Sequence, residues 1–275
     1  MSIPARVAAA LAAAFLAALV ASPAATLAAG PRPRDADASG RVALPAGEFT
    51  PVLPPGPDTR TVRVAAFELY RRPVTNAEFL AFVQAQPAWR RDRVARLYAD
   101  ESYLARWAAP DALGAEVRPA QPVTQVSWYA ARAYCSAHAA RLQSWYEWEY
   151  AAAADETRAD ARRDPAWRER ILGWYARSAT GPLPLVGRSA PNYYGVEDLH
   201  GLVWEWVEDY AGLMVSGDSR EQGDPDKLQF CGAGALAVGS RDDYPVLMRI
   251  ALLSSLAARD TTTSLGFRCA AGGAQ

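Results

Sequence analysis

The stretch that decides the fold is residues 192–206, which reads NYYGVEDLHGLVWEW. Asn, Gly and Asp residues interrupt it at short intervals, and similar short runs continue to the C-terminus. We therefore expect no helical signal after Gly173. The closing Trp204 and Trp206 are interpreted as core residues, because the nine tryptophans of one domain cannot all be ligand platforms. The chain after Gly173 is predicted to form irregular loops and short strands.

Helix signals lie upstream of this stretch, and N-terminal caps predict three helices, over residues 76–84, 128–139 and 145–154. Thr75 and Ser144 each lie three residues before a glutamate, which is the spacing of a capping box, and Ser127 is a third cap. Residues 41–52 and 61–69 cluster apolar side chains around Pro and Gly. They predict two short strands joined by a turn.

The region between the first two predicted helices is charged and irregular. Residues 89–119 are interpreted as a long surface excursion that either meets a ligand or covers the core. Helices early and irregular strands late predict an α+β fold rather than a parallel βαβ sheet. No Gly-rich phosphate loop follows a predicted strand.

The composition excludes some classes of partner. With 29 basic and 30 acidic residues the formal charge is -1, so the chain has no bulk attraction to nucleic acid or anionic lipid. Hydrophobic residues make up 51% of the 275, which is enough for one sizeable core. We expect a monomer without a nucleic-acid partner.

The N-terminus has the pattern of a secretory signal peptide. A basic start precedes an unbroken apolar run over residues 7–20, and small residues allow cleavage after Ala24 or Ala28. The alternative is an uncleaved anchor, because residues 7–29 could just cross a bilayer. Periplasmic or secreted localisation is expected, with no membrane span after signal removal. The predicted organisation is a signal peptide over 1–28, a flexible linker over 29–41 and one domain over 42–275.

Three cysteines follow the signal, in a chain expected to reach an oxidising compartment. They are Cys135, Cys231 and Cys269. One disulfide and one remaining thiol are predicted, and their spacing alone does not choose the pair.

Five segments carry a family resemblance through their order and spacing. They are PVTNAEF at 73–79, PVTQVSW at 122–128 continuing to AYC at 133–135, WYEWEYAA at 145–152, the stretch at 192–206, and LGFRC at 265–269. Together they resemble the formylglycine-generating-enzyme, or sulfatase-modifying-factor, family. The resemblance implies a single loop-rich, distorted C-type-lectin-like α+β domain with little regular secondary structure.

The chain departs from this family at its chemistry. Formylglycine-generating members use two cysteines, five residues apart and upstream of the closing GFR, to hold copper and activate oxygen. No cysteine occurs here between Gly232 and Arg268. Because two soft thiolates select Cu(I), we expect no copper and no formylglycine production.

The resemblance also implies a structural calcium ion in the turn before WEW. Its ligands would be Asp198, Gly201, Val203 and Glu205, two through carboxylates and two through backbone carbonyls. The alternative is that Glu205 is solvated or salt-bridged beside core tryptophans. The family's disulfide positions match Cys135 and Cys269, which leaves Cys231 as the free thiol.

The catalytic candidates are Cys231, Arg249 and Ser254. A free cysteine can be reactive, bind metal, bridge to another chain, or act as a small buried hydrophobe. Arg249 and Arg268 flank the family's substrate cleft, where an arginine could grip a carboxylate or phosphate bidentately; salt bridges to Asp242 or Asp260 explain them equally well.

The histidines offer little support for an iron site. His138 and His200 are the only two in the chain, so a site of two histidines and one carboxylate would need both. One is predicted on a helix and the other in the calcium turn. The iron site is therefore disfavoured.

These features leave two hypotheses for function. The first is an accessory or maturation factor acting on an exported protein or small molecule, with redox chemistry as one option. The pattern around Phe230-Cys231-Gly232 resembles a subgroup associated with copper nitrite reductase and denitrification, and another exported branch without the cysteines matures a siderophore. The second hypothesis is a calcium-stabilised, non-catalytic scaffold that binds a protein or small-molecule partner.

Overall fold

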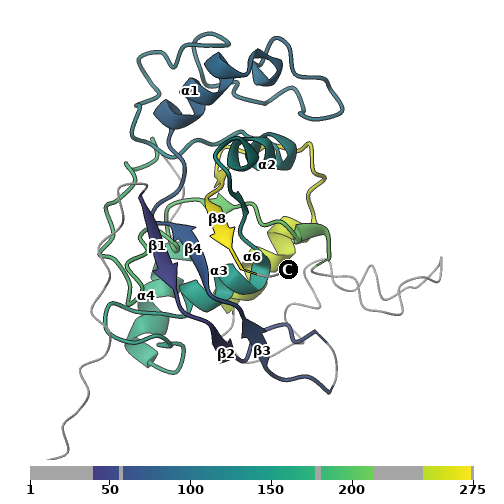
Figure 1. Ribbon diagram of the computed structural model, residues 1–275. Helices are drawn as coiled ribbons and strands as arrows, with labels where there is room; N and C mark the ends of the chain where they lie inside the picture. Colours follow the sequence, from purple (N-terminus) through teal and green to yellow (C-terminus); the bar gives the residue numbers. More distant parts are fainter. Residues whose placement is uncertain (1–39, 56–57, 177–180, 213–243, 274–275) are drawn as a thin grey trace, which may run out of the picture. The chain divides into compact units, whose positions relative to one another are not determined.

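The computed structural model describes residues 40–55, 58–176, 181–212 and 244–273, which form one compact unit (Figure 1). The predicted signal peptide, and the predicted linker up to residue 39, lie outside the described residues. The elements, in chain order, are β1 (Arg41–Leu44), β2 (Gly47–Phe49), β3 (Val62–Val64), β4 (Phe67–Tyr70), α1 (Asn76–Ala85), η1 (Pro87–Trp89), α2 (Trp128–Ala137), β5 (Arg141–Leu142), α3 (Trp145–Ala152), α4 (Pro165–Tyr175), β6 (Trp204–Glu205), η2 (Tyr210–Gly212), α6 (Tyr244–Ser254), β7 (Leu265–Gly266) and β8 (Cys269–Gly272).

The main sheet is antiparallel and has the strand order β1-β4-β8-β5. Its last strand in sequence, β8, therefore lies between β4 and β5, and Figure 1 shows it next to β4. The two predicted strands each divide in two, since β1 pairs with β4 while β2 pairs with β3. Val42, Leu44 and Leu69 alternate with exposed residues and face the core, as the twofold period of a strand requires.

The three predicted helix starts are confirmed. Thr75 and Ser144 each form a complete capping box, in which the side chain accepts from the backbone N–H three residues later. The Ser127 side chain accepts from the N–H of Ala130 and begins α2. The ends differ, because α2 and α3 each stop two residues before the predicted position.

The prediction that no helical signal follows Gly173 is wrong. Helix α6 lies well beyond it. Leu247, Ile250 and Leu253 recur every three residues and are all buried, which is the pattern of one helix face. Pro245 is in the first turn, where its missing N–H leaves no helical bond unmade. The sequence did not predict this short amphipathic helix, because turn-forming residues surround it.

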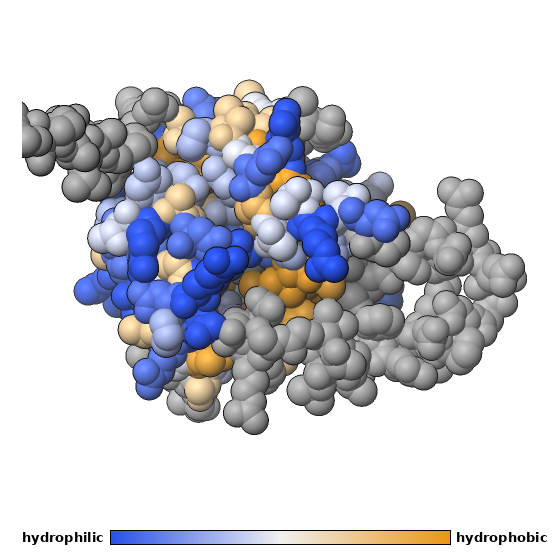
Figure 2. Space-filling view, turned by 90° about the horizontal axis from the view of Figure 1, so that it is seen from below, coloured by the Kyte–Doolittle hydropathy of each residue, from blue (hydrophilic) through white to orange (hydrophobic). Residues whose placement is uncertain are grey.

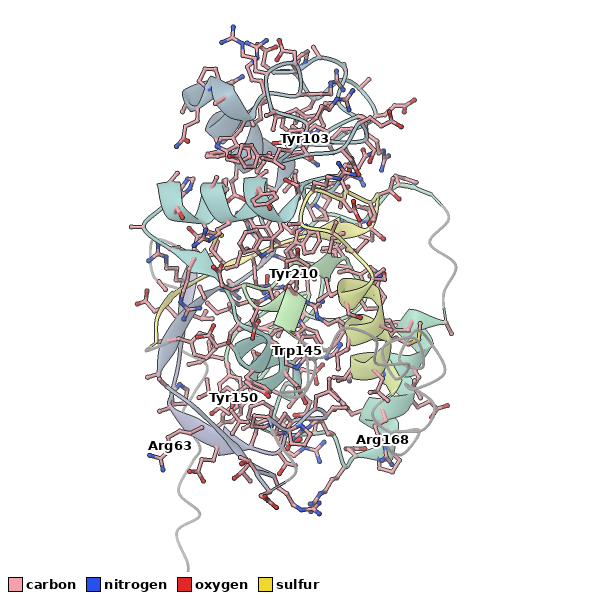
Figure 3. All side chains as sticks on the ribbon, turned by 90° about the vertical axis from the view of Figure 1, so that its right-hand side faces the viewer. Arg63, Tyr103, Trp145, Tyr150, Arg168 and Tyr210 are labelled. Atoms are coloured by element: carbon pink, nitrogen blue, oxygen red, sulfur yellow. A yellow bond between two sulfur atoms is a disulfide. The ribbon has the colours of Figure 1, made fainter. Side chains whose placement is uncertain are left out.

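The core is rich in aromatic side chains. Trp145, Trp148 and Trp206 are among the largest fully buried residues, as expected for core tryptophans. Figure 3 shows Trp145 and Tyr210 in the interior of the described unit, with Arg63 and Arg168 toward its periphery. Hydrophilic side chains dominate much of the face in Figure 2, around a smaller apolar area. Burial of these aromatic side chains removes a large apolar surface from water and so stabilises the fold.

The excursion over residues 89–119 covers part of the core. Tyr103, Leu104 and Trp107 are buried within it. The Trp107 ring N–H donates to the Asn76 side chain at the start of α1, at 3.2 Å. Of the two interpretations of this region, the structure therefore supports a cover over α1 and the core.

The architecture is the predicted α+β fold with little regular secondary structure. Most strands are two to four residues long, and loops connect most elements. Among the described residues, no helix combines the length and apolar character needed to cross a bilayer.

Candidate functional site

A buried ion pair joins the WEW and GFR segments. Strands β6 and β7 pair in parallel, with Glu205 opposite Gly266, so Arg268 lies next to the Glu205 carboxylate. Arg268 donates to it through Nε and Nη2 at 2.7–3.0 Å, and both side chains are 0% exposed. The Gln143 side-chain amide donates to the same carboxylate at 2.7 Å. Glu205 is therefore salt-bridged rather than solvated.

Arg268 also holds three backbone carbonyls. Its guanidinium donates to the oxygens of Tyr70, Arg71 and Glu197 at 2.9–3.2 Å. One side chain thus ties the end of β4, the stretch over 192–206 and β6 together. These contacts account for the buried Arg268 guanidinium without a salt bridge to Asp260. The other proposed partner, Asp242, lies outside the described residues.

Arg249 lies on the inner side of α6 and is 1% exposed. Its Nη2 donates to the backbone carbonyl of Glu205 at 2.5 Å. Its guanidinium stacks over Trp148, with Cζ 4.0 Å from the ring centroid, and lies 5.8 Å from that of Trp145. Burial lowers the pKa of Arg249 to about 10. The proposed partner Asp260 instead accepts from the N–H of Ala257.

The catalytic candidates do not come together in the described part of the chain. Ser254 is exposed at the end of α6, where its hydroxyl donates to the Ala251 carbonyl of its own helix. Arg249 is buried on another side of the same helix. Cys231 lies outside the described residues. An active site shared by Arg249 and Ser254 is not supported.

The turn around Asp198 is a tight, hydrogen-bonded loop. Asp198 has a φ of 59°, and its carboxylate accepts from the N–H groups of Gly187 and Ser189 at 2.5 and 3.2 Å. Gly201 has a φ of 83°, and a Cβ there would lie 2.9 Å from the Trp174 ring. Only glycine fits this position, because both the left-handed backbone and the close ring exclude a side chain.

The two carboxylates expected to bind calcium already accept hydrogen bonds from the protein. The Glu205 carboxylate already accepts four hydrogen bonds, from Arg268 and Gln143, which use its lone-pair directions. Asp198 is occupied by backbone N–H groups. Calcium requires six to eight oxygen ligands. Calcium binding through Asp198, Gly201, Val203 and Glu205 stays a prediction, because an ion would have to compete with these hydrogen bonds.

Both histidines are used structurally. A ring nitrogen of His138 lies 2.8 Å from the Tyr134 carbonyl, and the two rings stack. His200 Nε2 lies 2.9 Å from the Ala152 carbonyl, and burial lowers the pKa of His200 to about 4. Within the described ranges, no group of three or more His, Cys, Asp or Glu side chains is arranged to hold a metal ion.

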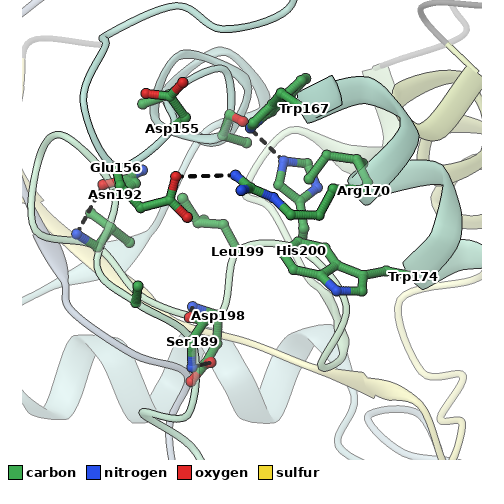
Figure 4. Close-up of a pocket in the computed structure, with 15 residues that line it drawn as sticks. Asp155, Glu156, Trp167, Arg170, Trp174, Ser189, Asn192, Asp198, Leu199 and His200 are labelled. Atoms are coloured by element: carbon green, nitrogen blue, oxygen red, sulfur yellow. Dashed lines mark hydrogen bonds and ion pairs between the residues drawn. The ribbon is translucent and has the colours of Figure 1, made fainter. Parts of the chain in front are cut away.

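A cavity of about 140 Å³ lies beside His200, between α4 and the turn over residues 187–200 (Figure 4). Trp167 and Trp174 of α4 form part of its wall. Each charged residue of its wall has a partner. Glu156 pairs with Arg170 at 3.1 Å. The Asp155 carboxylate accepts from the Thr157 N–H and the Arg158 side chain, and the Asp198 carboxylate accepts from the Gly187 N–H. The sequence interpretation missed this cavity, although two tryptophans seven residues apart mark one helix face.

The disulfide joins Cys135 of α2 to Cys269 of β8. These residues are 134 positions apart. The chain has three cysteines, so Cys231 is the only one left outside this bond.

Comparison with known proteins identifies relatives over most of the chain. A formylglycine-generating enzyme of Streptomyces coelicolor is 30% identical over 301 residues, which cover 90% of this chain and 94% of that protein. An inactive C-alpha-formylglycine-generating enzyme 2 of Bos taurus is 28% identical over 275 residues, covering 84% and 87%. The solved structure of PvdO from Pseudomonas aeruginosa has a TM-score of 0.45 at 22% identity and covers 84% of this chain and 93% of that one.

The family model extends through all the segments that carry the resemblance. It describes the sulfatase-modifying factor enzyme 1-like domain, FGE-sulfatase, and matches residues 27–272. This match spans the ion pair of Glu205 with Arg268 and both disulfide cysteines. The chain belongs to the FGE-sulfatase family.

Proposed function

We propose that this protein is an exported member of the family that makes no formylglycine and acts as an accessory or maturation factor for an exported enzyme or metabolite. One observation carries the proposal. The chain has three cysteines, and the disulfide uses Cys135 and Cys269, so one thiol remains. A copper site of two thiolates, which the family's oxidase chemistry needs, cannot be assembled from one thiol.

The similarity to an inactive formylglycine-generating enzyme supports the first part of the proposal, because the fold is compatible with loss of that activity. The signal-peptide pattern supports export. The Phe230-Cys231-Gly232 pattern makes a copper nitrite reductase the first partner to test.

A peptide assay tests the loss of oxidase activity. The purified mature protein is incubated with a sulfatase-motif peptide, Cu(I) and oxygen, and mass spectrometry follows conversion of the peptide cysteine to an aldehyde. The Streptomyces coelicolor enzyme is the positive control. We expect no aldehyde above the no-enzyme rate, and catalytic aldehyde formation would refute the proposal.

A deletion strain tests the maturation role. The gene is removed from its source organism, and the copper content and activity of the exported nitrite reductase are measured. We expect both to fall, and to recover with a plasmid copy. Full copper loading in the deletion strain would exclude this partner.

The second candidate is a non-catalytic binding scaffold. It is favoured by the contacts of Glu205 and Arg268, polar residues of the most specific motifs. Both side chains bind other segments of the fold and are therefore not available to a substrate. Cys231→Ser distinguishes the two functions. If it abolishes an effect on the partner while binding is retained, a chemical role is supported; an unchanged effect supports the scaffold.

A further inference from the structure

Helix α4 presents one face to the cavity beside His200. Four residues of the helix line that cavity: Trp167, Arg170, Ile171 and Trp174. Counted from the first of them, the others follow at three, four and seven positions, which is the spacing of a single helix face. The helix therefore places two indole rings and one guanidinium on the same wall.

The interior of the cavity is largely apolar. Besides the two tryptophans, its wall includes Ile171, Val196 and Leu199, which are 2–6% exposed. The cavity measures about 140 Å³. An apolar cavity of about 150 Å³ is large enough for a benzene ring, so a side chain of about six carbons fits this space.

One ion pair at this cavity is accessible to solvent. Glu156, in the loop after α3, lies 3.1 Å from Arg170, and the two side chains are 46% and 45% exposed. Figure 4 shows them reaching toward each other, with Leu199 beside their contact. An exposed pair contributes little to stability, so its two side chains separate easily. The cavity thus offers one cation and one anion next to an apolar space.

The other charged groups of the wall are held within the fold. The Asp155 carboxylate accepts from the Arg158 guanidinium at 2.5–2.9 Å, and the Asp198 carboxylate accepts from backbone N–H groups. Within the described ranges, Glu156 and Arg170 bond only to each other. A ligand can therefore separate these two side chains without breaking another contact of the fold.

We propose that this cavity binds a free amino acid with an apolar side chain, in its zwitterionic form. The ligand's side chain fills the apolar space, its carboxylate accepts from Arg170, and its ammonium donates to Glu156. Charge complementarity carries this choice, because a zwitterion replaces both halves of the ion pair, whereas a singly charged ligand leaves one half without a partner. The site goes beyond the proposed function, because it requires neither an exported enzyme nor turnover.

Isothermal titration calorimetry of the full mature chain tests the site with four ligands. L-leucine carries both charges and the side chain. N-acetyl-L-leucine keeps only the carboxylate, L-leucinamide keeps only the ammonium, and glycine keeps both charges but has no side chain. We expect saturable one-to-one binding of leucine. Each of the other three should bind at least about tenfold more weakly, because each lacks one of the three contacts.

Two variants assign the charges to these residues. Arg170→Gln should weaken the binding of leucine and N-acetylleucine without weakening that of leucinamide. Glu156→Gln should weaken leucine and leucinamide without weakening N-acetylleucine. Glu48→Gln is the matched control, because it removes one half of another exposed ion pair, with Arg63 at 3.0 Å, and should leave leucine binding unchanged.

Three results would overturn the proposal. They are the absence of saturable leucine binding, an equal affinity for leucine and either singly charged derivative, and an unchanged leucine affinity in both Arg170→Gln and Glu156→Gln.

Discussion

Arg268 and Glu205 belong to different sequence motifs and act as one structural unit. Their pairing follows from the parallel contact of β6 with β7, in which residues 204–205 lie beside 265–266. The motifs predicted a calcium role for Glu205 and a substrate role for Arg268. Neither prediction included a contact between the two side chains. A partner 63 positions away can be identified only once the strands are placed.

The first prediction concerns this ion pair. Arg268→Met leaves the Glu205 carboxylate buried without its cation, which should lower the free energy of unfolding by about 3–5 kcal/mol. Urea denaturation measures the change. Arg63→Met removes an exposed pair with Glu48 and should cost less than about 1 kcal/mol. Equal effects of the two substitutions would show that the buried pair is not a structural centre.

How much the sequence could predict differs from residue to residue at the site. The cysteine pair of the disulfide and the absence of a second free thiol could be inferred from motif positions and a count. The burial of Arg249 could not, because it depends on how α6 packs against α3 and β6. Packing partners that are distant in sequence leave no local pattern.

The helices show which local signals are sufficient. Capping boxes placed the starts of α1 and α3 at the correct residues, because a cap is a local hydrogen-bond pattern that side chains encode directly. Helix ends were less predictable, since α2 and α3 stop without a strong C-terminal signal. Helix α6 was missed because its apolar face lies among turn-forming residues.

A second prediction tests a cap. Ser144→Ala removes the acceptor for the Glu147 N–H and should lower the free energy of unfolding by about 1 kcal/mol. Ser254→Ala is the matched control, because that exposed hydroxyl bonds only its own last helical turn. Thermal or urea unfolding compares the two. A larger loss in Ser254→Ala would contradict the assignment.

A third prediction concerns α4, which packs on His200 through Trp167, Trp174 and Tyr175. Burial lowers the pKa of His200 to about 4, below its usual value near 6.5, so the folded state holds it neutral. The unfolded chain binds the extra proton between these values. The contribution of neutral His200 to the free energy of unfolding is therefore complete above pH 6.5. It is lost as the pH falls toward 4, by roughly 3 kcal/mol in total.

His200→Gln removes this titration. The stability of the wild type relative to the variant should decrease as the pH falls from 7 to 4.5, measured by urea denaturation at each pH. His138→Gln, at an exposed histidine, controls for loss of an imidazole. A wild-type advantage that stays constant over this range would show that His200 is not held neutral by burial.

For the whole molecule, the order of the motifs predicted the α+β domain, and the structure and family match support it. The long-range topology brings β8 between β4 and β5, and the disulfide fixes that return of the chain to α2. The division at residues 28 and 41 remains a prediction, as do export and the partner.

A fourth prediction tests the disulfide. Replacing both Cys135 and Cys269 by alanine should lower the free energy of unfolding by roughly 4–5 kcal/mol, because the bond closes a long loop in the unfolded chain. The wild type, unfolded without reductant, should expose one reactive thiol per chain, that of Cys231. Three thiols would show that the bond does not form.

The most direct measurement of the central claim is a Cu(I) competition titration. The oxidised mature protein and the Streptomyces coelicolor formylglycine-generating enzyme are titrated without oxygen against a chromophoric Cu(I) chelator. The single thiol predicts that this protein takes no stoichiometric copper from the chelator, whereas the enzyme does. A tightly bound Cu(I), one per chain and retained in Cys231→Ser, would contradict the account.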